Sequence, residues 1–272
     1  MSFRSITTLV RRYAPTRLKK IRFRFVAQSL RRRLARATSI RSQVELATRR
    51  EVYRSNQKAL EMEALLERVI AIQPCVMCEI GSDCGGTLAL FGRNADSNAK
   101  IISIDLNDSD ERLVAFDQLV SPSIQLVTLV GNSHDASTLD QLEAALEGRS
   151  LDVLFIDGDH SLEGVYQDFR DYAPLLREGG ILAFHDIVSD KVESASEKSA
   201  TIYAGGVPEF YSKYIENAFS GESFIANQSQ SGYGIGFVSW PDKTRANALV
   251  AQVVSEFEYC NDHRSEHRSK AA

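Results

Sequence analysis

The stretch that decides the fold is Glu79-Ile80-Gly81-Ser82-Asp83-Cys84-Gly85-Gly86-Thr87, which ends and follows the apolar run Cys75–Ile80. A short apolar run without polar alternation is typical of a strand buried on both faces of a parallel sheet. The glycines favour a tight turn into a helix, because glycine adopts positive φ and lets a ligand approach the backbone closely. The start of that helix offers unpaired N–H groups to an anion. The stretch therefore predicts a strand–turn–helix unit with a ligand site at the carboxyl end of the strand.

Four more apolar runs of this kind follow along the chain. Segments with the apolar spacing of helices separate them, so strand and helix alternate. Repeated β-α units predict right-handed crossovers and a doubly wound, mostly parallel sheet. The predicted strands are Cys75–Ile80, Ile101–Leu106, Ile124–Val130, Leu151–Ile156 and Gly180–His185, with helical segments near 86–95, 110–120, 136–147 and 162–177.

The pattern differs before the first strand and after the fifth. A helix is predicted over 51–72, and another near 208–219, beyond a polar stretch. Two consecutive apolar segments, 222–228 and 234–240, predict an antiparallel hairpin at one side of the sheet. The expected fold is therefore a seven-stranded, Rossmann-like α/β sheet with an antiparallel last strand, and a final helix over 242–259 packs against it.

The spacing of the glycine turn does not match a dinucleotide site. The fingerprint G-x-G-x-x-G needs a glycine where Asp83 stands, and the pattern from Glu79 to Gly85 is instead E-x-G-x-x-x-G. Asp105 ends the second predicted strand, 24 residues after Gly81, where a carboxylate can accept hydrogen bonds from two ribose hydroxyls. A nicotinamide-dependent oxidoreductase stays open as an alternative, although the missing glycine and the terminal strand pair count against it.

This turn resembles the first motif of the class I S-adenosylmethionine-dependent methyltransferases. The resemblance implies that its acid and glycines surround the methionine part of the cofactor. It also implies that Gly131-Asn132-Ser133, after the third strand, lies beside the adenine. The cofactor-binding residues expected on this basis are Glu79, Gly81, Ser82, Gly85, Asp105, Asn132 and Asp157.

Acids and histidines gather where the fourth and fifth predicted strands end. The two ends are Phe155-Ile156-Asp157-Gly158-Asp159-His160 and Phe184-His185-Asp186, and the two strands are neighbours in the predicted topology. Three carboxylates and two imidazoles should therefore surround one crevice. Close like charges raise a carboxylate pKa unless they are compensated. A divalent cation such as Mg²⁺ relieves this repulsion through oxygen ligands.

The same two segments resemble O-methyltransferases and their relatives near cephalosporin hydroxylase. The matching motifs are F-I-D-G-D-H-S-x-E-G-V at 155–165 and R-E-G-G-I-L-A-F-H-D at 177–186, within a resemblance that covers about residues 75–240. It implies a metal held by Asp157, His185 and Asp186, with His160 as the catalytic base beside Asp157. Relatives often have a carboxylate at the position of His185, so the identity of the metal stays open.

The activity that the resemblance implies is methylation of a hydroxyl on a sugar, glycan or secondary metabolite. Near neutral pH a histidine such as His160 is suited to remove the hydroxyl proton. Residues 189–214 are expected to cover the substrate with Tyr203, Phe210, Tyr211 and Tyr214, although half or more of these aromatics could be core. A binding module that senses the cofactor without turnover is the other alternative.

Charge divides the chain into a basic arm, 1–50, a domain, 51–262, and a polar tail, 263–272. The arm has 15 basic residues and one acid, a net charge of +14, whereas the remainder carries −18. We expect the arm to be helical and to dock on an anionic surface, foremost the inner face of a membrane. Packing on its own domain or on a second subunit, a disordered tail and a transit peptide are alternatives. Nucleic acid is disfavoured, because no reading motif accompanies the charge.

The composition predicts a cytoplasmic location for the domain. No apolar run reaches the length of about 18 residues that a membrane span needs. Arginines interrupt the apolar runs where a signal peptide would have its core. Cys75 and Cys78 form a C-x-x-C on a predicted strand, where residues three apart point to opposite faces, so we interpret them as core residues and not as a metal site.

Overall fold

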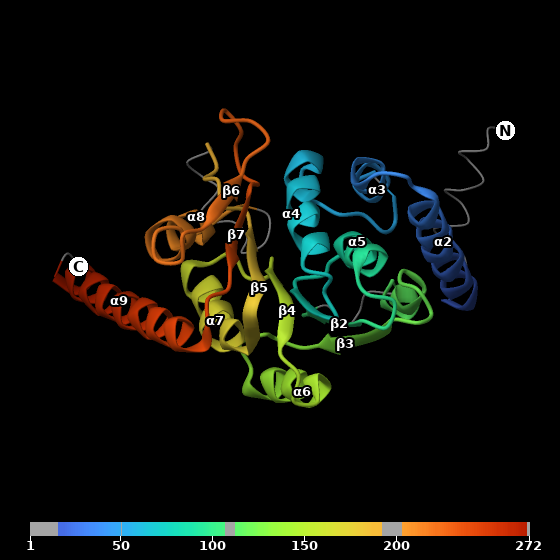
Figure 1. Cartoon of the computed structure of the whole chain (residues 1–272). Helices are drawn as coiled ribbons and strands as arrows, with labels where there is room; N and C mark the ends of the chain where they lie inside the picture. The colour runs from blue at the N-terminus through green and yellow to red at the C-terminus, as the bar shows by residue number, and fades with distance from the viewer. Residues whose placement is uncertain (1–15, 50, 107–111, 192–202, 271–272) are drawn as a thin grey trace.

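A seven-stranded sheet forms the centre of the molecule in the computed structural model, which describes residues 16–49, 51–106, 112–191 and 203–270 (Figure 1). The strand order is β3-β2-β1-β4-β5-β7-β6. The first five strands are mutually parallel, and β7 is antiparallel to both of its neighbours. This confirms the doubly wound sheet with an antiparallel last strand. The strands are β1 (Val76–Ile80), β2 (Lys100–Asp105), β3 (Gln125–Val130), β4 (Leu151–Ile156), β5 (Leu176–His185), β6 (Glu222–Phe224) and β7 (Ile235–Ser239).

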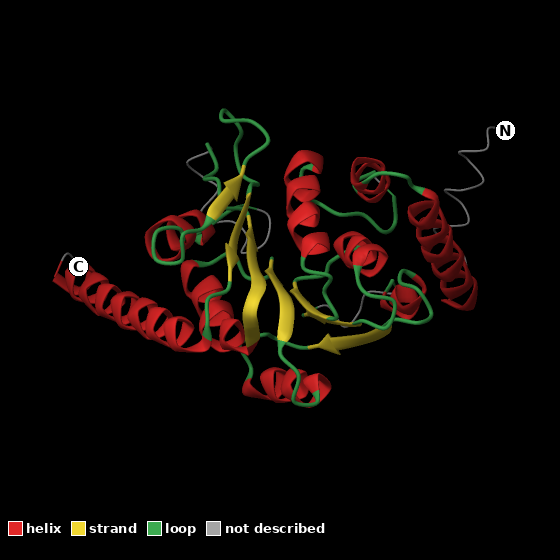
Figure 2. Cartoon of the chain, in the orientation of Figure 1, coloured by secondary structure: helices red, strands yellow, loops and turns green. Residues whose placement is uncertain are grey.

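Helices cover both faces of the sheet (Figure 2). On one face, buried residues of the first four helices of the described residues pack together with the 3₁₀ turn η1. On the other face, the later helices form a second apolar core, which is rich in aromatic rings. The first face carries α2 (Thr16–Arg36), α3 (Ile40–Ala47), α4 (Ala59–Ala71), α5 (Gly86–Asn94) and η1 (Leu113–Gln118). The second carries α6 (Ala136–Leu146), α7 (Leu162–Tyr172), η2 (Ala173–Leu175), α8 (Val207–Phe210), η4 (Tyr211–Ile215) and α9 (Lys243–Lys270).

The helix expected over 51–72 begins only at Ala59, so that prediction was wrong over its first two turns. Residues 51–58 run instead as a loop, because tertiary hydrogen bonds hold their backbone. Ser55 N–H donates to Ala47 O at 2.8 Å, and Gly86 N–H donates to Arg54 O at 3.2 Å. The loop therefore lies directly against the glycine turn that begins α5.

Two other helical segments are shorter than expected. The segment near 110–120 is the 3₁₀ turn η1, and residues 107–111 before it lie outside the described part of the chain. The segment near 208–219 is one turn of α-helix, α8, followed by the π-helical turn η4.

Ser161 is the N-cap of α7, with its hydroxyl accepting from Gly164 N–H at 2.9 Å, while Asp159 accepts from Ser161 N–H at 2.9 Å.

The basic arm is helical from Thr16 and packs partly onto the domain. Ala27, Leu30 and Leu34 of α2 are buried, as are Val44 and Ala47 of α3. Residues 1–15 and 50 of the expected arm lie outside the described residues. Among the residues that the structure describes, no helix combines the length and the apolar character of a membrane span.

Candidate cofactor and catalytic site

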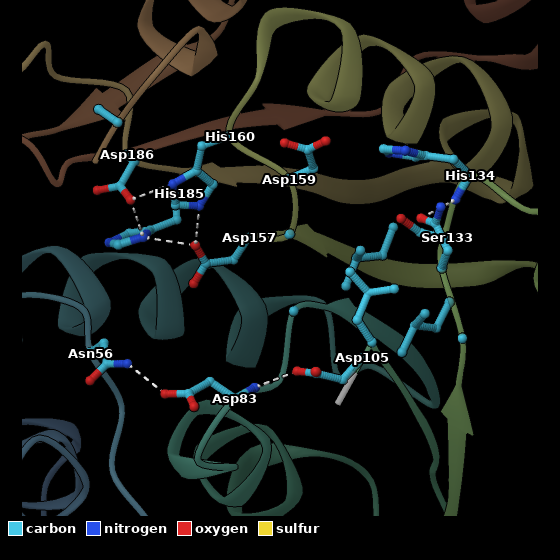
Figure 3. Close-up of a pocket in the computed structure, with 18 of the residues that line it drawn as sticks. Asn56, Asp83, Asp105, Ser133, His134, Asp157, Asp159, His160, His185 and Asp186 are labelled. Atoms are coloured by element: carbon cyan, nitrogen blue, oxygen red, sulfur yellow. Dashed lines mark hydrogen bonds and ion pairs between the residues drawn. The ribbon is translucent and has the colours of Figure 1, made fainter. Parts of the chain in front are cut away.

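A cavity of about 740 Å³ opens where the carboxyl ends of the parallel strands meet (Figure 3). Residues that end or follow β1 to β5 line it, which is where ligands bind in open α/β sheets. Its volume suits a ligand of the size of a nucleoside derivative with room beside it, since such cavities measure about 300–1,000 Å³. The cavity therefore lies at the edge of the sheet where the sequence predicts a ligand site.

At two positions of the turn after β1, the backbone conformation and the neighbouring atoms leave no room for a side chain, so glycine is required. Gly81 has φ +88°, and a Cβ placed on it would lie 1.9 Å from the carbonyl oxygen of Asp157. Gly85 has φ +75°, and its Cβ would lie 2.8 Å from Leu119 Cδ1. Gly81 lines the cavity, whereas Ser82 is turned away from it and bonds the hydroxyl of Ser103. The turn thus presents backbone to a ligand on one side and packs against η1 on the other.

Glu79 lies at the end of β1, buried beneath the cavity. Its Oε2 atom has no hydrogen-bond partner in the described part of the chain. Burial raises its pKa well above the usual value, and the charges of Asp157, Asp105 and Asp83 raise it further. Burial and the neighbouring carboxylates therefore both disfavour the charged form of Glu79.

Asp105 ends β2 and faces the cavity, as predicted. Its Oδ2 accepts a hydrogen bond from Asp83 N–H at 2.8 Å, which ties it to the glycine turn. The Asp83 carboxylate in turn accepts from Asn56 Nδ2 at 2.8 Å and pairs with Arg112 at 3.2 Å. The ends of β1 and β2 and the loop 51–58 thus form one hydrogen-bonded wall (Figure 3).

The turn after β3 forms the opposite end of the cavity. Asn132 lines it and accepts from His134 N–H at 3.1 Å. His134 also lines the cavity, and its Nε2 lies 3.3 Å from Asp168 Oδ1 on α7. Asp168 is fully buried, and burial raises its pKa, while its hydrogen bond raises the pKa of His134.

Four side chains from the ends of β4 and β5 form a compact cluster (Figure 3). His185 Nδ1 lies 3.0 Å from Asp157 Oδ1 and 3.3 Å from Asp186 Oδ2. His160 lies on the same two carboxylates, with Nε2 3.4 Å from Asp157 Oδ1 and Nδ1 3.5 Å from Asp186 Oδ2. The structure thus brings together four of the five acids and histidines that the sequence placed at this edge, whereas Asp159 lines the cavity outside the cluster.

The carboxylates control the protonation of both imidazoles. Burial lowers the pKa of His185, but the charges and hydrogen bonds of Asp157 and Asp186 outweigh it and raise this pKa to about 10. Burial also lowers the pKa of His160, and the same two acids raise it above its ordinary value. Burial alone would raise the pKa of Asp157, yet the two histidines hold it well below the usual range.

Neighbouring segments orient this cluster. His160 Nδ1 lies 2.7 Å from the carbonyl oxygen of Tyr203, so its Nδ1–H donates there and the neutral ring keeps its lone pair on Nε2. Gln57 Nε2 donates to Asp157 Oδ2 at 2.6 Å. Asp186, with φ +61°, accepts from Tyr233 N–H at 2.9 Å. Three segments distant in sequence thus hold the cluster in place.

The donor set of this cluster suits a hard or borderline divalent cation. Asp157, His160 and Asp186 each offer a ligand atom, and these atoms lie within 4.8 Å of one another. His185 Nδ1 faces the same carboxylates, so either imidazole could complete a set with two carboxylate oxygens.

Several residues of the site have no motif in the sequence. Asn56, Gln57, Asp190 and Tyr233 lie on loops whose positions depend on tertiary contacts. His134 follows a predicted strand end and could have been found there. Of the aromatics expected near the substrate, Phe210, Tyr211 and Tyr214 are buried in the second core, which is the alternative that the sequence left open for half or more of them. Residues 192–202 of the expected cover lie outside the described residues.

Comparison with known proteins gives one family match and several similar structures. Residues 78–187 match the family model of a methyltransferase domain. MycE methyltransferase from the mycinamycin biosynthetic pathway, in complex with Mg, SAH and mycinamycin VI, is 18% identical over 77% of this chain and 55% of its own, with a TM-score of 0.50. An O-methyltransferase from Bacillus cereus in complex with SAH is 18% identical over 64% of this chain and 79% of its own, with a TM-score of 0.49. TomG, an O-methyltransferase from Streptomyces achromogenes in complex with SAM, is 17% identical over 80% of this chain and 96% of its own, with a TM-score of 0.48. No curated protein matches the sequence.

The sheet order with its antiparallel β7, together with the glycine turn and the cavity at the strand ends, is that of the class I methyltransferase fold. The segment that matches the methyltransferase domain spans the glycine turn, Asp105 and the β4–β5 cluster. The fold and the matched segment therefore agree.

Proposed function

We propose that the protein is an S-adenosylmethionine-dependent O-methyltransferase whose acceptor is a hydroxyl on a sugar, a glycan or a secondary metabolite. The observation that carries the proposal is the cluster of Asp157, His160, His185 and Asp186, which shares one cavity with the glycine turn. A carboxylate–imidazole cluster of this kind can both bind a hydroxyl oxygen and remove its proton. MycE, which is similar in fold, is seen with Mg, SAH and mycinamycin VI, and this supports a small-molecule acceptor.

The cofactor is proposed to lie along the ends of β1, β2 and β3. Asp105 would accept hydrogen bonds from the ribose hydroxyls, and Asn132 would lie beside the adenine. Glu79, Gly81, Ser82 and Gly85 would form the turn around the methionine part, with Asp157 at its far end. Ser82 has a supporting part in this arrangement, because its hydroxyl bonds Ser103 and not the cavity.

His160 is proposed as the general base. The carbonyl of Tyr203 holds Nδ1–H, so Nε2 is the atom that can take the proton of the acceptor hydroxyl. In-line displacement at the methyl carbon also needs the acceptor oxygen, the methyl group and the sulfur aligned, which is a task of positioning. Asp157 contributes to this positioning, because it lies between the glycine turn and the two histidines.

Asp157, His185 and Asp186 are proposed to hold a divalent cation, Mg²⁺ or another. Such a cation would act as a Lewis acid that lowers the pKa of the acceptor hydroxyl. An imidazole ligand is softer than a carboxylate, so Mn²⁺, Co²⁺ and Zn²⁺ are to be tested beside Mg²⁺. Both imidazoles contact the same two carboxylates, His185 through Nδ1 alone and His160 through both ring nitrogens, and experiment can separate their roles.

The test combines cofactor binding, metal content and methyl transfer. Calorimetry should show S-adenosylmethionine binding with a dissociation constant in the micromolar range or below, about −8 kcal/mol. Asp157→Ala and Asp186→Ala should abolish transfer of labelled methyl groups to a panel of sugars and polyketide glycosides. Full activity in chelator, with no metal in the purified protein, would refute the metal.

Substitution of each histidine separates ligand from base. His185→Ala should lose metal and transfer together, whereas His160→Ala should lose transfer and retain metal at its wild-type stoichiometry. The opposite result would exchange the roles of the two histidines. Retained cofactor affinity with no transfer to any acceptor, metal-loaded or not, would favour a binding module over an enzyme.

A further inference from the structure

Helix α2 carries two apolar faces on opposite sides. Leu18, Ile21 and Phe25 are spaced by three and four residues, so they form one stripe along the helix. Each precedes a buried residue, Ala27, Leu30 or Leu34, by nine positions. Nine residues are two and a half turns at about 3.6 residues per turn, which places the two sets on opposite faces. The inner face packs on the domain, and the outer face points away from it.

The outer face is exposed to an extent that is unusual for large apolar residues. Leu18 is 54% exposed, Ile21 58% and Phe25 69%. Together they form a contiguous stripe over two turns of one helix, whereas single exposed apolar residues need no explanation. Phe23, two residues before Phe25, turns inward and packs against the first core.

Basic residues surround this stripe. Helix α2 has nine lysines and arginines and no acid. Arg17, Lys20 and Arg24 are exposed beside the stripe, and Arg32 and Arg36 are exposed toward the end of the helix. An exposed apolar stripe flanked by cations matches a helix that lies in the interface of an anionic bilayer, with its apolar side chains below the level of the phosphates.

We propose that α2 docks the enzyme on an anionic lipid surface through Leu18, Ile21 and Phe25, with Arg17, Lys20 and Arg24 pairing with lipid phosphates. A second copy of the chain fits the outer face less well, because two such helices would bring like charges together. Nucleic acid fits less well too, because its phosphates would contact the arginine and lysine side chains and leave the apolar stripe exposed to water. The occupant proposed is the bilayer.

The inner face gives this docking a fixed relation to the cavity. Helix α2 packs on η1 and α5, and Arg31 Nη1 of the same helix donates to Val120 O at 2.9 Å. Phe116 and Leu119, in and after η1, lie directly behind Gly85 of the cofactor turn. The helix is therefore part of the rigid domain, and a bound bilayer would hold the enzyme in one orientation relative to its cavity. Figure 1 shows α2 at one end of the molecule, with α9 at the other.

This packing determines which variant can test the proposal. Removing the arm up to Glu51 would also remove Leu30, Leu34 and Val44 from the core, so substitutions in the full chain are used instead. The apolar variant is Leu18→Ser/Ile21→Ser/Phe25→Ser, and the charge variant is Lys20→Gln/Arg24→Gln. Matched controls are Leu60→Ser on α4, where Leu60 is 58% exposed, and Lys243→Gln/Arg245→Gln on α9.

The experiment is sedimentation with vesicles of phosphatidylcholine alone or with phosphatidylglycerol added. The wild-type chain and both controls should sediment with the anionic vesicles only. Both test variants should bind these vesicles at least about tenfold more weakly. The charge variant removes two basic residues, each of which contributes a factor of about five near the surface. The apolar variant removes the three side chains that would be buried in the interface. Thermal unfolding is measured in parallel, and unchanged midpoints show that the loss is not one of folding.

Four results would overturn the proposal. The first is a wild-type chain that stays in the supernatant with anionic vesicles at low salt. The second is binding of the test variants as tight as that of the controls. The third is a lower oligomeric mass of the apolar variant in sedimentation velocity with vesicle binding unchanged, which would assign the face to a second copy. The fourth is a loss of affinity of the charge variant for a DNA duplex with vesicle binding unchanged, which would assign the face to nucleic acid.

Discussion

Removal of the Asp105 carboxylate should weaken cofactor binding by an amount that the structure allows to be worked out. One oxygen, Oδ2, is already engaged by Asp83 N–H at 2.8 Å. In the proposed placement the same carboxylate accepts a hydrogen bond from the ribose. A hydrogen bond to a charged acceptor contributes about 1.5–3 kcal/mol. Loss of one such bond in Asp105→Ala predicts an increase in the dissociation constant of about 10- to 150-fold.

The assay is isothermal titration with S-adenosylmethionine and with S-adenosylhomocysteine. Asp105→Asn separates the two roles of the side chain, because its amide oxygen can still accept from Asp83 N–H while its charge is gone. It should fall between wild type and Asp105→Ala. Asp140→Ala, at an exposed acid on α6, is the matched control for loss of one negative charge. An unchanged dissociation constant in Asp105→Ala, with an unchanged unfolding midpoint, would refute the placement of the ribose.

Three further predictions concern residues that the sequence did not indicate. The carboxylate of Glu61 accepts hydrogen bonds from Ala226 N–H, Gly234 N–H and Gln230 Nε2. Glu61→Leu should therefore lower the free energy of unfolding by about 3 kcal/mol or more and the melting temperature by about 6–12 °C. A decrease of less than about 2 °C in the melting temperature would contradict this. Gln57→Leu removes the donor to Asp157 Oδ2 and should slow methyl transfer by about 10- to 100-fold. The control is Gln141→Leu at an exposed position on α6, and a wild-type rate in Gln57→Leu would exclude the role. The hydrogen bond to Asp168 raises the pKa of His134, so the stabilisation by His134 should be complete below about pH 6.5 and be lost as the pH rises through the raised value. Urea unfolding of wild type and His134→Gln at about pH 6 and about pH 9 checks the sign, and a difference in stability that grows with pH would show it to be wrong.

Where the sequence carries a local pattern, it predicted the fold and most of the candidate site. The first five strands begin within four residues of their expected starts, because a strand buried on both faces must be apolar throughout. Gly81, Asp105 and the β4–β5 cluster could be placed because residues that end parallel strands meet at one edge of the sheet.

Residues that depend on the path of a loop could not be placed in this way. The segment 51–58 has the composition of a helix start, yet hydrogen bonds to Ala47 and Gly86 hold it as a loop and bring Gln57 onto Asp157. The ring of Tyr211 packs over Gly236 of β7, and this contact places Tyr211 in the core. The sequence alone put it in the segment 189–214 that was expected to cover the substrate.

The sequence by itself determined the sheet, the cofactor turn and the identity of the acids and histidines at the strand ends, because each depends on neighbours within a few residues. Only the tertiary structure decided that both histidines share the same two carboxylates, and that the carbonyl of Tyr203 sets the tautomer of His160. Only the tertiary structure decided which face of the basic helix is buried. Both outcomes depend on contacts between segments far apart in the chain, and the pattern of residues along one segment does not contain them.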